Sequence, residues 1–464
     1  MTLVAGIDSS TLSTKVLLVD AETGRIVDSG TASHPGGTEC PPTAWWDALR
    51  EAGAGLLDRA AAVAVAGQQH GMVALDADDR VIRPALLWND TRSAPQARRL
   101  IAEGGGPNAW AQQTGSVPTA SFTVTKLAWL AENEPGNAAK TAAVMLPHDW
   151  LTMKLREAGP AEATTDRSDA SGSGYWSPAT GDYLPGKVID ALGHRPGLPR
   201  VAAPNEIVGR TPAGAVVAPG SGDNAAAALG LGLEPGDVVV SLGTSGTVYG
   251  LAENPAADAE GQVAGFADAT GRFLPLVCTL NAARVLDTVA GLLNVDHAGF
   301  DALALSAEPG SAGLALLPYL DGERTPNRPR ATGVLSGLST GTTRADLARA
   351  AVEGMLCAQA DGLAALAAHG VSVERVLLIG GAGASRAVRH IAPTVFGVDV
   401  HVPRTAEYVA LGAARQAAWA LSGRQHPPQW DSGDPERFTG RAAAGVSGQY
   451  ARLRDETASW ASHR

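Results

Sequence analysis

The chain has 464 residues, a formal net charge of −11, and scattered Lys and Arg residues. A single hydrophobic core stops growing at about 250–300 residues, so two domains are expected, and scattered cations argue against a nucleic-acid partner. Its three cysteines show no disulfide or metal-ligand spacing, and no apolar stretch is long enough to span a membrane. The sequence therefore predicts a cytoplasmic protein without membrane contact.

The first thirty residues predict a β-hairpin with a polar loop. Two apolar strands flank the loop SSTLST, whose small side chains allow backbone N–H groups to approach a phosphate. Thr11, Ser13 and Lys15 are therefore candidate phosphate contacts. Asp8 ends the first strand, and its carboxylate would repel phosphate unless Mg²⁺, bound through water, lay between them. An ordinary tight turn, with Lys15 a solvated strand residue, is the alternative.

Two polar clusters follow apolar strands further along the chain. The segment GQQHGM carries Gln69 and His70, and the segment LLWND carries Trp88 and Asp90. Planar hydrogen-bonding side chains beside an aromatic ring suit a polyol, so a sugar site is one interpretation. For His70 alone, a structural histidine is an equal alternative.

The stretch GSGDNAAAALG, residues 220–230, places Asp223 and Asn224 between a glycine-rich turn and an alanine run that predicts a helix. An Asp at this point is most often an N-cap, whose carboxylate accepts a backbone N–H of the first turn. A catalytic base is the other interpretation, and the spacing alone leaves both open.

The hairpin pattern recurs in the middle of the chain. Residues 237–242 lead through the small-residue loop GTSG into a second strand, and a third loop, GGAGAS, follows the apolar residues 375–379. These loops match neither the P-loop nor the Rossmann spacing. Their candidate phosphate or adenosine contacts are Gly243, Thr244, Gly381, Ala382 and Gly383. Strands alternating with helices predict α/β layers with mixed sheets, divided into domains at residues 1–235 and 236–464.

These segments together resemble the FGGY carbohydrate kinases of the actin-like ATPase superfamily. Two family signatures fit in full, SFTVTKLAWLAEN at residues 121–133 and GVLSGLSTGTTRADLARAAVE at residues 333–353. The other motifs occur in the family's order, so the resemblance spans nearly the whole chain. It implies an α/β fold of two actin-like, ribonuclease H-like domains around a central cleft.

The resemblance also implies the chemistry, which is ATP-dependent phosphorylation of a sugar with Mg²⁺. The motif QxHG together with WND resembles the family members that act on D-xylulose. The alternatives are a kinase for L-ribulose, gluconate or glycerol, or an actin-like ATPase without sugar chemistry. Asp223 is then the general base and Asp8 the Mg²⁺ residue. The expected sugar contacts are Gln69, His70, Trp88, Asp90, Asp223 and Asn224. The expected ATP contacts are Thr11, Ser13, Lys15, Gly243, Thr244, Gly381, Ala382 and Gly383. Many relatives are dimers, so a homodimer is also expected.

The sequence departs from the family pattern at two places. The first loop has fewer glycines, so Ser10 and Ser13 must supply hydroxyl groups or fit more tightly. Where many relatives carry Lys-Asp, this chain has His148 and Asp149. Because a histidine ordinarily titrates near pH 6.5, a basic group is expected at position 148 only at low pH.

Overall fold

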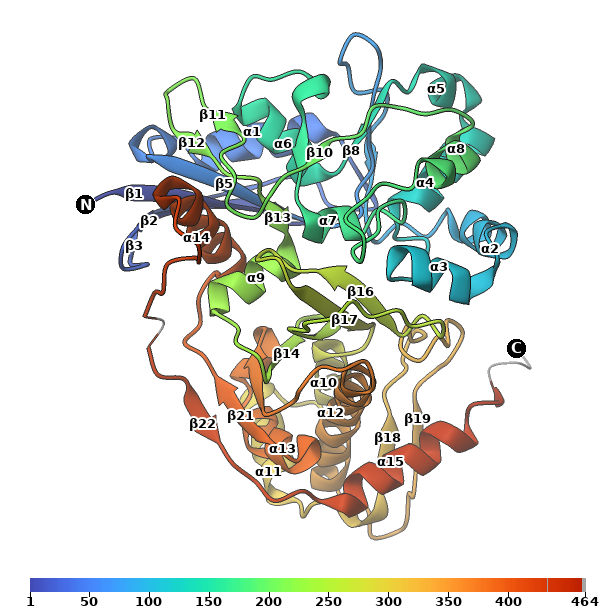
Figure 1. Cartoon of the computed structure of the whole chain (residues 1–464). Coiled ribbons are helices and arrows are strands. Elements are labelled where there is room, and N and C mark those ends of the chain that lie inside the picture. The colour runs from blue at the N-terminus through green and yellow to red at the C-terminus, as the bar shows by residue number, and fades with distance from the viewer. Residues whose placement is uncertain (432, 461–464) are drawn as a thin grey trace. The chain divides into compact units, whose positions relative to one another are not determined.

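The computed structural model describes residues 1–431 and 433–460 (Figure 1). The chain divides into two compact units. Unit 1 comprises residues 1–233, 253–274 and 406–432, and unit 2 comprises residues 234–252, 275–405 and 433–464. Unit 1 therefore takes in two short segments from the second half of the chain. Among the described residues, no helix combines the length and the apolar character of a membrane span.

Unit 1 is built on a mixed sheet in the order β11-β12-β5-β1-β2-β3, with β13 also paired to β5. Its strands are β1 (Leu3–Ser9), β2 (Ser13–Asp20), β3 (Ile26–Ser33), β5 (Ala62–Gly67), β11 (Gly209–Arg210), β12 (Val216–Val217) and β13 (Ser221–Gly222). Strands β1, β2 and β3 run antiparallel, whereas β5 runs parallel to β1, β12 and β13. The predicted first hairpin is confirmed.

The remaining elements of unit 1 are short strands and helices. The strands are β4 (Glu39–Cys40), β6 (Val73–Leu75), β7 (Ala85–Leu86), β8 (Ala143–Met145), β9 (Thr164–Thr165), β10 (Arg200–Val201) and β16 (Val263–Ala267). The helices are α1 (Pro42–Ala52), α2 (Ala94–Glu103), α3 (Gly106–Thr114), α4 (Thr123–Asn133), α5 (Pro135–Lys140), α6 (Pro147–Leu155), α7 (Arg167–Ser171), α8 (Pro185–Leu192), α9 (Asp223–Leu231) and α14 (Tyr408–Ser422).

Both faces of the unit 1 sheet are covered, as the alternation of side chains along its strands requires. Ile7 and Val65 belong to a core shared with α1 and α6, whereas Val4 and Ala64 belong to a second core shared with α9 and α14. The second core is lined largely by alanines, so its helices lie close together. A Cβ added to Gly412 of α14 would lie 1.8 Å from the carbonyl oxygen of Ala226 in α9. This close packing fixes the helix that begins at Asp223.

Unit 2 repeats the hairpin topology. Its strands occur in the order β17-β15-β14-β20-β21-β22. They are β14 (Asp237–Leu242), β15 (Gly246–Gly250), β17 (Phe273–Thr279), β20 (Arg375–Ile379), β21 (Asp399–Val402) and β22 (Glu436–Phe438). The first two residues of β17 belong to unit 1. Strand β14 pairs antiparallel with β15 and parallel with β20, as β1 pairs with β2 and β5. The predicted second hairpin is therefore confirmed. Strands β18 (Ala315–Leu317) and β19 (Val334–Ser336) form a separate ribbon, and the helices are α10 (Ala283–Leu293), α11 (His297–Ser306), α12 (Arg344–Ala368), α13 (Arg386–Phe396) and α15 (Ala444–Glu456).

Candidate active site

Three parallel strands of unit 1 bring the predicted sugar and metal residues to one edge of the sheet. Asp8 of β1 and Ser221 of β13 lie on opposite sides of Ala66 in β5. The segment carrying Gln69 follows β5, and Asp223 follows β13. In α/β sheets the carboxyl ends of parallel strands form the usual ligand edge. Residues more than 200 positions apart in the sequence therefore converge there.

Asp223 is the first residue of α9, and Gly222 is its N-cap. The interpretation of Asp223 as an N-cap is therefore wrong. Asp223 Oδ1 accepts hydrogen bonds from the backbone N–H and the side-chain amide of Asn224, at 2.7 and 2.8 Å. The backbone N–H of Asp223 itself also interacts with the carboxylate. Burial raises the pKa of Asp223 to about 6, against the lowering effect of these hydrogen bonds, so the carboxylate is mostly ionised at pH 7.

Asp8 lies at the end of β1 in a buried position with an unsatisfied oxygen. Its Oδ1 accepts no hydrogen bond from the described residues. Burial and the negative charge of Asp223 raise the pKa of Asp8 to about 7, while the charge of Lys15 opposes the rise. A cation would remove this electrostatic cost, and Mg²⁺ is commonly held by one or two carboxylates with water. Asp8 therefore fits a ligand of a hydrated Mg²⁺.

Gln69 and His70 are fixed by the short helix α7. The Nε2 of Gln69 donates to the carbonyl of Ser168 at 3.3 Å, and the Nδ1 of His70 donates to the carbonyl of Gly172 at 2.7 Å. His70 has a left-handed backbone conformation (φ 68°), and its ring packs against Phe122 at 4.7 Å. Such strain in a non-glycine residue persists only where the surroundings hold it. These contacts are compatible with a structural role, a sugar contact or both.

The LLWND segment divides into two environments. Trp88 is partly exposed, and its Nε1 donates to Thr11 Oγ1 at 3.0 Å, which links the predicted sugar wall to the first phosphate loop. Asp90 is buried, and both of its oxygens accept from Arg92, whose charge and hydrogen bonds hold the pKa of Asp90 below its usual value against the effect of burial. Arg92 in turn pairs with Glu39. Asp90 thus already has a charged partner within the fold.

The first loop closes on itself. The backbone N–H and the hydroxyl of Ser10 both donate to the carbonyl of Ser13 at 3.0 Å. The Ser10 hydroxyl is thus occupied within the turn. Lys15 Nζ lies 2.7 Å from Glu407 Oε2 in a partly exposed ion pair, so a phosphate would compete with Glu407 for this ammonium group. The roles of Thr11, Ser13 and Lys15 as ATP contacts stay predictions.

The predicted nucleotide loops of unit 2 are both anchored at one side. The carbonyls of Gly243 and Thr244 accept from the start of α10, and both residues are exposed. Gly381 is exposed and Gly383 is buried, and the carbonyl of Gly383 accepts from Arg389 at 2.6 Å. Ala382, between them, is also buried. The loops are thus held while part of each faces outward, and their contacts with ATP stay predictions.

A buried charge cluster beside this edge was not predicted from the sequence. His148 Nδ1 donates to Asp169 Oδ2 at 2.6 Å, and its Nε2 lies 3.3 Å from Asp149 and 3.9 Å from Asp166. The three carboxylates raise the pKa of His148 to about 9 against the effect of burial. The expectation that position 148 is basic only at low pH is therefore wrong, because the sequence shows Asp149 beside it but neither the burial of this pair nor the approach of Asp166 and Asp169. His148, Asp149 and Asp169 have metal-binding donors within 4.8 Å of one another, but a protonated imidazole supplies the positive charge itself.

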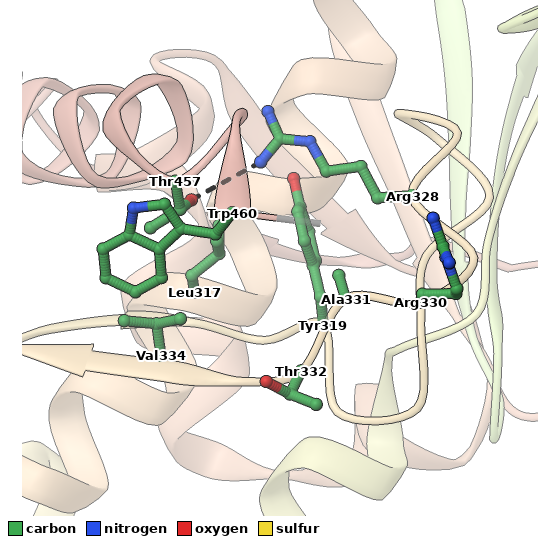
Figure 2. A pocket seen from close by; sticks show the side chains of 9 residues that line it. All are labelled: Leu317, Tyr319, Arg328, Arg330, Ala331, Thr332, Val334, Thr457 and Trp460. Atoms are coloured by element: carbon green, nitrogen blue, oxygen red, sulfur yellow. Dashed lines mark hydrogen bonds between the residues drawn. The ribbon is translucent and has the colours of Figure 1, made fainter. Parts of the chain in front are cut away.

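A separate pocket lies in unit 2, between the β18–β19 ribbon and the C-terminal helix (Figure 2). Arg328 donates to the carbonyl of Arg454 and to Thr457 Oγ1, and its guanidinium lies over the ring of Tyr319. The cavity has a volume of about 60 Å³, which is room for a few water molecules. It contains none of the predicted site residues and is too small for a sugar or a nucleotide.

Comparison with known proteins identifies the family. The chain is 50% identical over 438 residues to the xylulose kinase of Streptomyces rubiginosus, covering 91% of this chain and 88% of the relative. It is 35% identical to the xylulose kinase of Escherichia coli (strain K12), covering 90% of each chain. The crystal structure of xylulose kinase from Bifidobacterium adolescentis matches with a TM-score of 0.93 at 46% identity, covering 98% of this chain and 99% of that one. This match confirms the predicted α/β fold of two actin-like domains. Residues 3–230 and 238–421 match the N-terminal and C-terminal domains of one family, so the chain belongs to the FGGY family of carbohydrate kinases.

Proposed function

We propose that the chain transfers the γ-phosphoryl group of ATP to the terminal hydroxyl of D-xylulose, giving D-xylulose 5-phosphate and ADP. The names of its relatives support the sugar. The observation that carries the chemistry is the carboxylate of Asp223, which Asn224 orients through Oδ1 and which is mostly ionised at pH 7. It lies at the same sheet edge as the unsatisfied carboxylate of Asp8.

Asp223 acts as the general base. Its Oδ2 accepts the proton of the attacking hydroxyl as the new oxygen–phosphorus bond forms and ADP leaves with the bridging oxygen. The side chain is mostly ionised at pH 7 because its pKa is about 6, and Asn224 prevents it from rotating. Phosphoryl transfer depends mainly on positioning and charge stabilisation, so this fixed geometry is the main contribution of Asp223.

The other residues bind and orient the substrates. In unit 1, Gln69, His70 and Trp88 contact the sugar, and Asn224 and Asp90, whose carboxylate is paired with Arg92, are further sugar contacts. Mg²⁺, held by Asp8 through water, neutralises charge on the phosphates when it is bound. Residues 236–464 carry the nucleotide loops, and residues 1–235 carry the sugar site and the first phosphate loop. The central cleft, the homodimer and the cytoplasmic location stay predictions.

A sugar panel with ADP detection tests the proposal. D-Xylulose is expected to give the highest kcat/KM among D-xylulose, L-ribulose, gluconate and glycerol, with slow ADP release without sugar. Asp223→Asn is expected to lower kcat by about 10²–10⁴-fold, the usual contribution of general-base catalysis, with sugar binding nearly unchanged. A higher kcat/KM for another sugar would replace the substrate. Turnover of Asp223→Asn within a few-fold of wild type would overturn the role of the base.

A further inference from the structure

The first turn of α7 touches two of the segments that form the sugar site. Asp166 caps this helix by accepting the backbone N–H groups of Ser168 and Asp169, at 2.8 and 3.0 Å. Ser168 is buried, its carbonyl accepts from Gln69 Nε2, and its hydroxyl oxygen accepts from the backbone N–H of Gly222 at 3.0 Å. One residue therefore contacts a predicted sugar ligand and the N-cap of the helix that begins with the base.

The contact with Gly222 is structurally demanding. A Cβ added to Gly222 would lie 2.8 Å from Gln69 Nε2, so the glycine backbone passes directly against the amide of Gln69. Gly222 is the N-cap residue of α9, and as a glycine it has no side chain that could cap the helix or hold its own peptide in place. The hydroxyl oxygen of Ser168 supplies the acceptor for the N–H that immediately precedes Asp223.

His148 also contacts the first turn of α7. Its imidazole donates to Asp169, the neighbour of Ser168. The ring also lies directly against the strand that leads to Asp223, because a Cβ added to Gly220 would lie 2.5 Å from His148 Cδ2. The position of Ser168 is thus fixed by the Asp166 cap and by the ion pair of His148 with Asp169.

We propose that Ser168 is a positioning residue for phosphoryl transfer: its hydroxyl fixes the peptide of Gly222 and with it the direction of the Asp223 carboxylate. This inference rests on the proposed role of Asp223. It predicts an effect on kcat that is separate from sugar affinity. In Ser168→Ala the carbonyl that binds Gln69 remains, whereas the acceptor for Gly222 and the hydroxyl donor to Asp166 are lost.

Ser171 provides a matched control on the same helix. It is also buried, and its hydroxyl oxygen accepts a backbone N–H, that of Ala267, at 3.0 Å. Each variant therefore removes one acceptor of a backbone N–H and one hydroxyl donor, which serves the carboxylate of Asp166 in Ser168 and the carbonyl of Arg167 in Ser171. Both variants are expected to lower Tm. Only the hydrogen bond lost in Ser168→Ala holds the residue that precedes the proposed base, Asp223.

The experiment compares steady-state kinetics and amide hydrogen exchange of the full-length wild type and the two variants. Ser168→Ala is expected to lower kcat about tenfold, the factor that corresponds to the net contribution of one hydrogen bond. Its KM for D-xylulose and for ATP is expected to stay within about twofold, because no substrate contact is removed. Exchange in the peptide covering residues 220–226 is expected to rise in Ser168→Ala alone.

Several outcomes would overturn the inference. Equal kcat in the two variants, or a rise in the KM for D-xylulose at unchanged kcat, would show that Ser168 serves packing or sugar binding instead. If Ser168→Ala does not fold, Ser168→Cys replaces it, since the thiol is a weaker acceptor of similar size. A wild type that phosphorylates none of the tested sugars would refute the proposed function, while the exchange comparison would still decide whether Ser168 fixes Gly222.

Discussion

Replacing His148 by glutamine tests how unit 1 maintains its buried charge. Glutamine can still donate a hydrogen bond to Asp169, but it removes the positive charge from among three carboxylates. The carboxylates belong to Asp149, Asp166 and Asp169, which are each at most 2% exposed. The substitution therefore removes the cation that balances these carboxylates, of which burial already raises the pKa of Asp149 to about 7 and that of Asp169 to about 6.

Two estimates of the cost agree. Removing one partner of a buried ion pair costs about 3–5 kcal/mol, because the remaining charge is uncompensated. The rise in the pKa of His148 from its usual 6.5 to about 9 corresponds to about 3 kcal/mol of favourable interaction with the charged form. We therefore expect His148→Gln to lower the free energy of unfolding by about 3 kcal/mol at pH 7, a large part of the stability of an ordinary domain.

Urea unfolding at pH 7, followed by circular dichroism, measures this loss. His34→Gln is the control, because His34 is also buried but burial lowers its pKa, so it holds no charge; we expect it to cost about 1 kcal/mol or less. In the double variant His148→Gln with Asp169→Asn, one uncompensated carboxylate is gone, so the loss is expected to be smaller than the sum of the single losses. A loss equal to that of His34→Gln, or strict additivity, would refute the charge-balance argument.

Three further predictions follow from the same structure. Because the pKa of His148 is raised in the folded state, its stabilising effect is complete below pH 6.5 and is lost as the pH rises through about 9. In urea unfolding, the difference in stability between wild type and His148→Gln should shrink over this pH range. A difference that does not change with pH would contradict this prediction. Gly412→Ala should lower the free energy of unfolding by about 2 kcal/mol or more, since its Cβ would lie 1.8 Å from Ala226 O. Gly291→Ala, whose Cβ would have no atom within 4 Å, should raise the free energy of unfolding by up to about 1 kcal/mol. A higher Tm for Gly412→Ala than for Gly291→Ala would contradict the close packing of α9 on α14. Chelation of Mg²⁺ should abolish turnover without lowering Tm, as expected of a metal held through water by Asp8, and full activity in chelator would contradict that role.

The sequence was informative where local pattern determines the structure. Apolar runs flanked by small residues correctly predicted both hairpins and the strand before Gln69, since these features depend on near neighbours. The convergence of Asp8 and Asp223 follows from strands that end at the same sheet edge. The helix at Asp223 was also predicted, although the residue proved to be its first position and Gly222 its cap.

The sequence was uninformative where a side chain depends on distant partners. Helix α7 has five residues without periodicity, so nothing local indicated that Ser168 contacts Gln69 and Gly222. The pKa of His148 is raised by the adjacent Asp149 and further by Asp169 and Asp166, which lie about twenty residues away and are not linked to His148 by any local pattern. Lys15 pairs with Glu407, a separation of 392 residues. The N-cap residue Asp166 is a local sign of a helix start at α7, but a cap gives no information about tertiary partners.

If Trp88 binds the sugar and Thr11 binds the nucleotide, as proposed, the hydrogen bond between them couples the affinities for the two ligands. The indole belongs to the predicted sugar wall and the hydroxyl to the first phosphate loop, and they meet at 3.0 Å. A sugar that moves the indole alters the loop that the nucleotide meets. Linkage then requires the nucleotide to change the affinity for the sugar by the same factor as the sugar changes the affinity for the nucleotide. Loss of this hydroxyl in Thr11→Val would therefore weaken both effects together and by equal amounts.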